Sequence, residues 1–563
     1  MLLLGCLSII PAAAQRNLSG IVCDSNGEPL IGATVSVEGR KGLGAVTDLS
    51  GKYQLRLPEK HQTYILKVRF VGYVTESRSI SPQDRTADFR LKEDAIGMET
   101  VVVTGTRTPK RLKEVPVITR VITLDDIRKT DATNIVDVLE MEMPAIETSY
   151  SMDMQPSLNI QGFSGNAVLF LVDGERLAGE TMNDVDFSRL NMDNVERVEI
   201  VRGAASSIYG SNAVGGVINL IPRTSAEPWT ANVNARYGAY DNQRYGTTVS
   251  FRAGNFNNSF NLQRLSQGRI EYFNPDTEGD TASWNFKDRL TFTPNNQLKL
   301  TANVGYYYRE RERSSSEDNR YRDFTGGLKG RYLFSKGQSL EVSYAFDQYD
   351  KSDFDKVKRS DVRDYSNVQN SFRALYNHTF NRKHILTVGG DYLYDYLASY
   401  MFSGGETYRQ YTADAFAQFD WNPNRHFNAV ASARYDYYSE AKAQNFSPQL
   451  NLMYKLRNCS LRGSYAVGFR APTLKEMYSA FDMGSIWWIY GNEHLKPEKS
   501  HNFSLSAEYF KSRYNLTVTG YYNLVNDRID VQWDPSLENG KGAMMYTNIR
   551  KMKMAGANVD AAA

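Results

Sequence analysis

Residues that could support catalysis or phosphate binding occur in this chain without the spacings that those functions need. The sequence has no GxSxG nucleophile motif, no HExxH metal motif and no paired catalytic carboxylates in a recognisable context. The glycine-rich stretch after Arg202 contains neither GxxxxGKS/T nor GxGxxG, the common phosphate-binding motifs. We therefore expect no enzyme activity, no cofactor and no metal centre.

The stretch from Arg202 to Gly216 combines strand-like flanks with almost no side-chain volume. Apolar segments 195–201 and 217–221 enclose a run of alanine, serine and glycine. Small residues let two backbones approach closely, and glycine permits turns with positive φ. The candidates for such close contact are Gly203, Gly210, Gly215 and Gly216.

Composition narrows the class of protein. The 563 residues carry 66 basic and 64 acidic side chains, so the chain lacks the basic surplus of a nucleic-acid-binding protein. No run approaches the roughly 20 apolar residues of a membrane helix. Residues 1–15 read as a secretory signal peptide. The cysteines beyond it, Cys23 and Cys459, are too distant in sequence to indicate a disulfide framework.

From residue 229 to 563 the chain alternates polar and apolar residues in strand-length segments. In HFNAVASARYDYYSE, alanine and aromatic side chains share one face, while Asn428, Arg434 and Asp436 share the other. A soluble sandwich would bury the apolar face, whereas an outer-membrane barrel turns it to lipid and its polar face to the lumen. Short turns such as 293–297 alternate with long connections such as 471–499, which favours a transmembrane barrel.

Two further units precede the barrel. Residues 17–92 contain short strands separated by turn pairs such as Asn26-Gly27, a spacing typical of a small β-sandwich. Residues 106–223 mix helix and strand, with one helix expected to begin near Thr123 and another over 133–141. The sequence thus predicts a mostly β protein with an N-terminal β-sandwich, an α/β domain and a large antiparallel barrel.

Several motifs resemble known families. "SGIVCDSNGEPLIGATVSVEG" and "VRFVGYVT" resemble the carboxypeptidase-regulatory-like domain. "VERVEIVRGAASSIYGSNAVGGVINLI", "VLFLVDGERL" and "LNIQGF" are similar to the plug domain of TonB-dependent outer-membrane receptors. "FRAPTLKEMY" and "GNEHLKPEKS" resemble a barrel motif of the siderophore, haem and cobalamin receptors in that family. Ala204 departs from the family, which usually has proline after Arg-Gly.

The resemblance implies a transport mechanism in which the periplasmic protein TonB, driven by an inner-membrane complex, moves the plug. The expected pulling point is the TonB box, whose valines favour an extended strand that pairs with a partner; the alternative is a last strand of the β-sandwich. Its residues are Glu99, Thr100, Val101, Val102, Val103, Thr104 and Gly105. Glu196, Glu199 and Arg202 are candidates for polar contacts between plug and barrel, or for ion pairs within the plug.

The resemblance also places ligand contacts at the plug apex and in the outer loops. The candidates are Met152, Asp153, Met154, Trp487, Trp488, Tyr490 and His494. The tryptophans would offer flat apolar surface to a chelate, or would pack loop against loop. We expect a ferric siderophore as cargo, with haem or cobalamin as alternatives and a glycan or peptide as an alternative of another class.

The remaining expectations concern location and completeness. The resemblance implies a monomeric barrel in outer-membrane lipid, a periplasmic N-terminal domain and no nucleic-acid partner. A passive porin would need neither plug nor TonB box. The barrel segment holds about sixteen strands, whereas a barrel of this family needs about twenty-two. We therefore expect the barrel to be incomplete at its C-terminal side.

Overall fold

The computed structural model describes residues 15–562, with gaps. The gaps are 25–28, 31, 41–42, 49, 59–62, 71–72, 74, 92–100, 131, 133, 144–145, 151–155, 181–183, 225–227, 271–278, 336, 382, 485 and 512–513. Most of the expected signal peptide lies outside the described residues, as do Glu99, Thr100, Met152, Asp153 and Met154. No helix in the described part of the chain is both long enough and apolar enough to cross a membrane.

The chain divides into two compact units. The first contains residues up to 102 together with 110–114, and the second contains 103–109 and 115–563. Within the second, residues 103–109 and 115–223 are called the plug below, and the inward face of the strands after residue 228 is called the wall.

The first unit is a small β-sandwich, as the sequence predicted. One sheet has the order β4-β1-β7 and the other β3-β2-β5-β6. Leu18, Leu55 and Leu66 form part of the core between them. The strands are β1 (Gln15–Cys23), β2 (Thr34–Val37), β3 (Gly44–Val46), β4 (Lys52–Pro58), β5 (Tyr64–Arg69), β6 (Glu76–Ile80) and β7 (Phe89–Arg90). A short hairpin, β8 (Val101–Val102) with β9 (Lys110–Arg111), and the 3-10 turn η1 (Leu112–Glu114) complete the unit.

The plug is an α/β domain around a five-stranded sheet of order β10-β16-β17-β14-β15. Its strands are β10 (Thr119–Thr123), β14 (Val168–Val172), β15 (Glu175–Arg176), β16 (Val195–Arg202) and β17 (Gly216–Pro222). The Thr123 side chain and Asp126 form a capping box at the start of α1 (Leu124–Lys129), as the sequence indicated. Ile122, Val198 and Ile218 lie in its core.

The other elements of the plug surround this sheet. They are the helices α2 (Ile135–Glu142) and α3 (Ser206–Tyr209), the sheet of β11 (Ile146–Tyr150), β12 (Pro156–Ile160) and β13 (Phe163–Ser164), and the 3-10 turns η2 (Gly165–Ala167), η3 (Phe187–Arg189) and η4 (Met192–Asn194).

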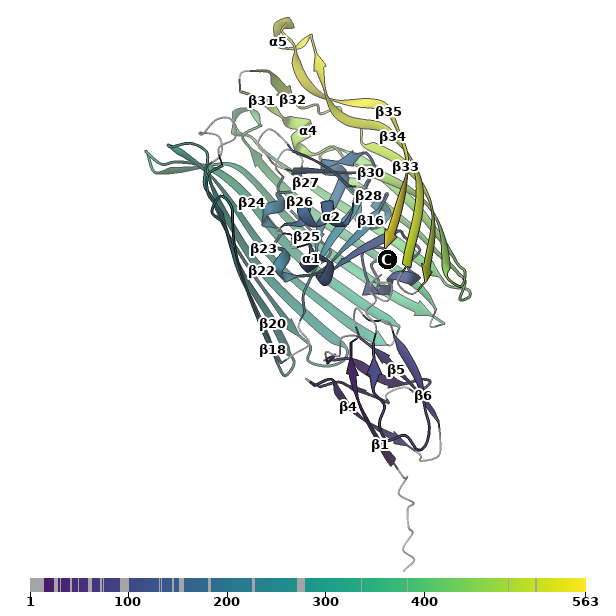
Figure 1. Ribbon diagram of the computed structural model, residues 1–563. Helices are drawn as coiled ribbons and strands as arrows, with labels where there is room; N and C mark the ends of the chain where they lie inside the picture. The colour runs from purple at the N-terminus through teal and green to yellow at the C-terminus, as the bar shows by residue number, and fades with distance from the viewer. Residues whose placement is uncertain are drawn as a thin grey trace, which may run out of the picture. The chain divides into compact units, whose positions relative to one another are not determined.

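An antiparallel sheet of eighteen strands forms the rest of the second unit and curves around α1, α2 and β16 (Figure 1). In the described residues its order runs from β18 to β35, and two of its strands, β31 and β32, are only three residues long. The sixteen long strands agree with the number expected from the sequence. Two short helices and one 3-10 turn lie in connections: α4 (Leu474–Tyr478), α5 (Leu537–Gly540) and η5 (Ser403–Gly405).

The strand bounds of the large sheet are as follows: β18 (Trp229–Gly238), β19 (Asn242–Ala253), β20 (Phe256–Gln267), β21 (Thr281–Phe292), β22 (Leu298–Glu312), β23 (Glu317–Ser335), β24 (Gln338–Asp355), β25 (Ser360–Phe380), β26 (His384–Ser399), β27 (Thr407–Trp421), β28 (Phe427–Tyr438), β29 (Ala443–Lys455), β30 (Cys459–Arg470), β31 (Ala480–Asp482), β32 (Trp488–Tyr490), β33 (Glu498–Lys511), β34 (Tyr514–Asp534) and β35 (Ala543–Ala562).

Burial in the large sheet is reversed relative to a soluble sandwich. On β29, Phe446 and Leu450 are 59% and 43% exposed, while Asn445, Ser447 and Asn451 are 3% exposed or less. Polar side chains therefore face the plug, and apolar side chains face outward. This is the arrangement of a membrane barrel, whose outer face contacts lipid and whose lumen is polar.

Candidate functional site

The small-residue stretch of the plug lies against the wall. The Ser207 hydroxyl lies 3.0 Å from that of Ser432 on β28. At the next strand but one, the Phe469 N–H donates to the Ser206 hydroxyl at 3.2 Å. A Cβ on Gly210 would lie 2.7 Å from the Arg434 guanidinium, and Gly210 has φ +77°. Both the close approach and the backbone angle therefore require glycine at this position.

Two of the other three candidate glycines pack inside the plug and not against the wall. A Cβ on Gly215 would lie 2.4 Å from the Cβ of Phe163, and one on Gly216 would lie 2.4 Å from the Val201 carbonyl oxygen. Gly203 has φ +83° with no atom within 4 Å of its added Cβ, so it serves the turn, and it lines a small pocket between plug and wall. Gly203 and Gly210 therefore lie where the plug approaches the barrel.

The structure separates the two alternatives for the charged candidates of the plug. Both Glu196 and Glu199 form 2.9 Å ion pairs with Arg197, inside the plug. Arg202 instead reaches the wall, where its guanidinium lies 3.0 Å from Asp560 on β35. Glu199 and Arg202 are three residues apart on β16, so their side chains face opposite sides of the sheet.

Glu199 anchors two residues of the expected TonB box, Val103 and Thr104, to the plug. Its Oε2 accepts hydrogen bonds from the N–H groups of Val103 and Thr104 at 2.9 and 2.8 Å, and from the Thr104 hydroxyl at 2.6 Å. Asn219 donates to the same hydroxyl at 3.0 Å, and the Tyr209 hydroxyl donates to the Thr104 carbonyl at 3.0 Å. Thr104 is fully buried.

The rest of the expected TonB box differs in environment along its length. Val101 is half exposed and Val102 is buried, and both belong to the β8–β9 hairpin of the first unit. A Cβ on Gly105 would lie 3.0 Å from the Thr119 hydroxyl, so this residue is closely packed in the plug. The box therefore passes from an accessible strand to a tightly held anchor within five residues.

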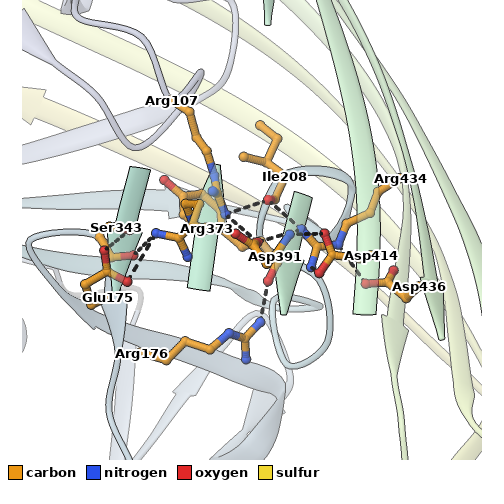
Figure 2. Close-up of polar contacts among 12 residues, drawn as sticks. Arg107, Glu175, Arg176, Ile208, Ser343, Arg373, Asp391, Asp414, Arg434 and Asp436 are labelled. Atoms are coloured by element: carbon orange, nitrogen blue, oxygen red, sulfur yellow. Dashed lines mark hydrogen bonds and ion pairs between the residues drawn. The ribbon is translucent and has the colours of Figure 1, made fainter. Parts of the chain in front are cut away.

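Arg107, immediately after that anchor, contacts both plug and wall. Its guanidinium donates to the Ile208 carbonyl at 2.8 Å and lies 3.6 Å from Asp391 of β26 (Figure 2). The Tyr209 ring lies 4.6 Å from its guanidinium carbon. Burial, together with the nearby Arg373, lowers the pKa of Arg107 to about 10. An arginine in such a position depends on its anionic partner.

Asp391 is the centre of the charged cluster shown in Figure 2. Its carboxylate faces Arg373 of β25 at 2.6 Å and Arg434 of β28 at 3.2 Å, in addition to Arg107. Arg434 also pairs with Asp436 at 2.7 Å and donates to the Ile208 carbonyl. Asp414 of β27 pairs with Arg434, and Arg373 pairs with Glu175, so the cluster joins the four wall strands β25 to β28 to three segments of the plug. Movement of Arg107 or Glu175 therefore alters its charge balance.

A cavity of about 200 Å³ lies on the side of this cluster nearer the long connections. Its lining includes plug residues, wall residues and α4: Asn166, Arg176, Glu180, Asp184, Tyr365, Asn367, Asp395, Tyr438 and Lys475. Glu180 pairs with Lys475 at 2.6 Å, and this pairing outweighs burial and lowers the pKa of Glu180. Burial raises the pKa of Asp184 to about 6.

The loop candidates lie apart from the described lining of this cavity. Trp488 and Tyr490 stack on each other at 5.8 Å in β32, which pairs with β31 and β35. Trp487 remains partly exposed, and the His494 N–H donates to the Asn492 side chain at 2.9 Å. Among the residues described, no cluster of three or more histidine, cysteine or acidic side chains could hold a metal ion.

The FRAP-like block has a structural role that the sequence did not reveal. Arg470, at the end of β30, contacts both carboxylate oxygens of Glu476 at 2.8 and 3.0 Å and pairs with Glu498 at 2.7 Å. Thr473 and Glu476 form a capping box at the start of α4. These bonds hold α4 over the lumen, where Lys475 reaches Glu180 of the plug.

A folded domain held by ion pairs within a polar barrel lumen defines a plugged transport barrel of a membrane. The family model "TonB dependent receptor-like, beta-barrel" matches residues 223–563, "TonB-dependent Receptor Plug Domain" matches 111–217, and "CarboxypepD_reg-like domain" matches 18–103. The chain belongs to the TonB-dependent receptors. It is accordingly an outer-membrane protein of a family of transporters, not enzymes, that work with TonB and bind external ligands.

Curated relatives and solved structures agree with this assignment. The iron-regulated outer membrane virulence protein of Vibrio cholerae is 27% identical over 463 residues, covering 77% of this chain and 69% of that protein. The vitamin B12 transporter BtuB of Vibrio cholerae is 27% identical over 499 residues, covering 81% and 75%.

Two crystal structures share the fold. The ferric enterobactin receptor PfeA has a TM-score of 0.67 at 16% identity, covering 78% of each chain. The siderophore receptor PirA from Acinetobacter baumannii has a TM-score of 0.66 at 17% identity, covering 79% of this chain and 77% of that one.

Proposed function

We propose that this receptor imports a ferric siderophore across the outer membrane. The observation that carries the proposal is the outer cavity, whose lining combines plug residues such as Glu180 with wall residues such as Tyr365. A ligand seated there contacts the domain that moves and the barrel that stays. At about 200 Å³ the cavity is smaller than typical small-molecule sites, so it holds part of a chelate and the outer loops cover the rest.

Residues 99–105 are the proposed site of TonB coupling. Val101 supplies an exposed strand residue for pairing with a partner, and Glu199 fixes Val103 and Thr104 to the plug. Pulling on the strand therefore loads the Glu199 anchor first. Because Arg107 follows directly, displacement of the segment next disturbs the Asp391 cluster.

The outer-membrane virulence protein among the relatives is iron-regulated, and both structural matches are siderophore receptors, which supports an iron chelate as cargo. The vitamin B12 transporter favours cobalamin as the second candidate. Haem, a glycan and a peptide are further alternatives. A single barrel in outer-membrane lipid, with its N-terminal β-sandwich in the periplasm, is the proposed working form.

The test is growth of a strain that lacks its other receptors of this family. Under iron depletion, purified ferric siderophores are expected to restore growth through this receptor, whereas haemin is not. Cobalamin is tested separately, in a cobalamin-requiring strain. Rescue by haemin or cobalamin, with no siderophore effective, would overturn the order of candidates.

Deletion of residues 99–105 provides the matched test of coupling. The deletion is expected to leave equilibrium binding of the active chelate unchanged and to abolish growth at equal surface expression. Continued uptake by the deletion variant would refute the proposed coupling site without affecting the assignment of the ligand.

A further inference from the structure

Three cavities follow one strand of the wall, β25, from end to end. Its inward-facing residues Asn367 and Gln369 line the outer cavity, and Gln369 with Ser371 lines a middle cavity of about 110 Å³. Leu375 and Thr379 line an inner cavity of about 460 Å³ near the short turns. The stretch from 367 to 379 is roughly 40 Å long at about 3.4 Å per residue, and at the usual strand tilt of about 45° it rises about 30 Å, close to the hydrocarbon thickness of a bilayer.

The cavities share lining residues, so little material separates them. The outer and middle cavities share Gln369, Ser371 and Leu393. The middle and inner cavities share Asp173 and Arg289. The β14–β15 hairpin of the plug lies between them. Its residues 172, 173 and 175–177 line the middle cavity, and Gly174 lines the inner one.

The hairpin ends at the edge of the plug sheet: β14 pairs with β17 over five residues, and only β15 is an edge strand. It turns through Asp173 and Gly174, with φ of +53° and +83°, the two-residue Asp-Gly turn that joins tightly paired strands. In the sheet order β15 is the last strand and pairs with β14 alone. It contains only two residues, so its displacement leaves the central strands β16 and β17 paired.

Cations of the wall hold the tip of the hairpin. Arg289 of β21 and Lys329 of β23 lie 3.0 and 3.3 Å from the Asp173 carboxylate. These two cations outweigh burial and lower the pKa of Asp173. Arg373 of β25 lies 3.3 Å from Glu175 and donates to the Gly174 carbonyl at 3.1 Å.

The same arginine connects the hairpin to the pulled segment. Arg373 binds Asp391 at 2.6 Å, and Asp391 lies 3.6 Å from Arg107, three residues beyond the Thr104 anchor (Figure 2). Withdrawal of Arg107 leaves Asp391 with fewer cations and strengthens its hold on Arg373. Arg373 uses Nε for Asp391 and Nη1 for Glu175, so a shift of its guanidinium toward Asp391 also moves the group that holds Glu175.

Removing the hairpin from the wall changes the charge of the route. Asp173, Glu175 and Arg176 leave with it. The described wall residues of the outer and middle cavities carry similar numbers of acidic and basic groups. Those of the inner cavity are mostly basic, namely Arg289, Lys299, Lys329, Arg331 and Arg373 against the acidic Glu341. A surface with that surplus of cations attracts anions and repels cations.

We propose that residues 173–176, the turn and β15, are the gate of a route along β25, and that the inner end of this route favours an anionic cargo. The cargo statement rests on the proposed import function and narrows it to chelates with net negative charge. Displacement of a two-residue edge strand opens the route without unfolding the plug.

The gate is tested without ligand or TonB, in proteoliposomes that contain the full receptor and a trapped dye. The double variant Asp173→Asn, Glu175→Gln removes the hairpin charges. Release of anionic carboxyfluorescein is expected to rise roughly tenfold over wild type, the change expected for each 1.4 kcal/mol or so lost from the closed state. Release of cationic rhodamine 6G is expected to rise less.

Arg202→Gln is the matched control, since it breaks an ion pair between plug and wall at β35, away from β25. It is expected to leave both dyes retained. Equal release from this control would mean general loosening of the plug and would overturn the gate, as would a double variant as tight as wild type. Faster release of the cationic dye would overturn the anionic route.

A second variant guards against misfolding of the plug. Lys329→Met leaves the plug sequence unchanged and removes one of the two wall cations that hold Asp173, and it is expected to increase release of carboxyfluorescein to a smaller extent. The gate would also be refuted if this variant folds and retains the dye while the double variant fails to fold. Because neither dye is a nutrient, failure of the siderophore assignment would leave these results interpretable.

Discussion

Glu199→Gln is expected to release the anchor of the pulled segment. The substitution keeps the shape of the side chain but replaces a carboxylate oxygen that accepts three hydrogen bonds, from two N–H groups and one hydroxyl. Hydrogen bonds to charged groups contribute about 1.5–3 kcal/mol each, whereas neutral ones contribute about 1. The amide also weakens the pairing with Arg197. A net loss of about 3 kcal/mol raises the detached population roughly 100-fold.

The assay is thiol labelling of Val103→Cys in a background without Cys23 and Cys459. Labelling of the purified receptor by a maleimide is expected to accelerate between about 10-fold and 100-fold in Glu199→Gln. Glu196→Gln is the control, because Glu196 pairs with the same arginine but is partly exposed, and it is expected to label at the parental rate. Equal labelling rates in all three proteins would refute the role of Glu199 as the anchor.

Three further predictions test burial, ion pairing and close packing. Because burial raises the pKa of Asp184 from 3.8 to about 6, the folded plug binds the extra proton in that window. Its stability therefore falls as pH rises through it, and Asp184→Asn should reduce this pH dependence, measured as protection factors of plug amides corrected for their intrinsic exchange rates. Arg470→Met leaves two carboxylates unpaired and should lower the temperature at which the barrel loses its compact gel mobility, whereas Arg313→Met, at an exposed pair, should not. Gly210→Ala should reduce hydrogen-exchange protection of the plug more than Gly203→Ala, since both have positive φ but only the former meets a guanidinium.

Period-two alternation predicted the strands, and the alternation of short and long connections favoured a barrel over a sandwich. In the segment that contains Asn428 and Asp436, polar residues recur at every second position except at Val430, and both side chains face the lumen in the structure. A strand directs alternate side chains to opposite faces, so the pattern is local and can be recognised without knowing which strands pair. The capping box at Thr123 and the turn residues of the β-sandwich are local for the same reason.

Only the tertiary structure decided which charges meet. Arg107 lies almost three hundred positions before Asp391 and Arg434, which come from different strands, and nothing near each of them in sequence marks it as part of one cluster. Glu199 and Arg202 lie on one strand, yet one closes inward on the plug and the other reaches the wall. Such pairings depend on strand register and on how the plug sits inside the barrel, which are set by long-range packing. The sequence by itself determined the elements, and the contacts that hold the plug and its hairpin required the folded protein.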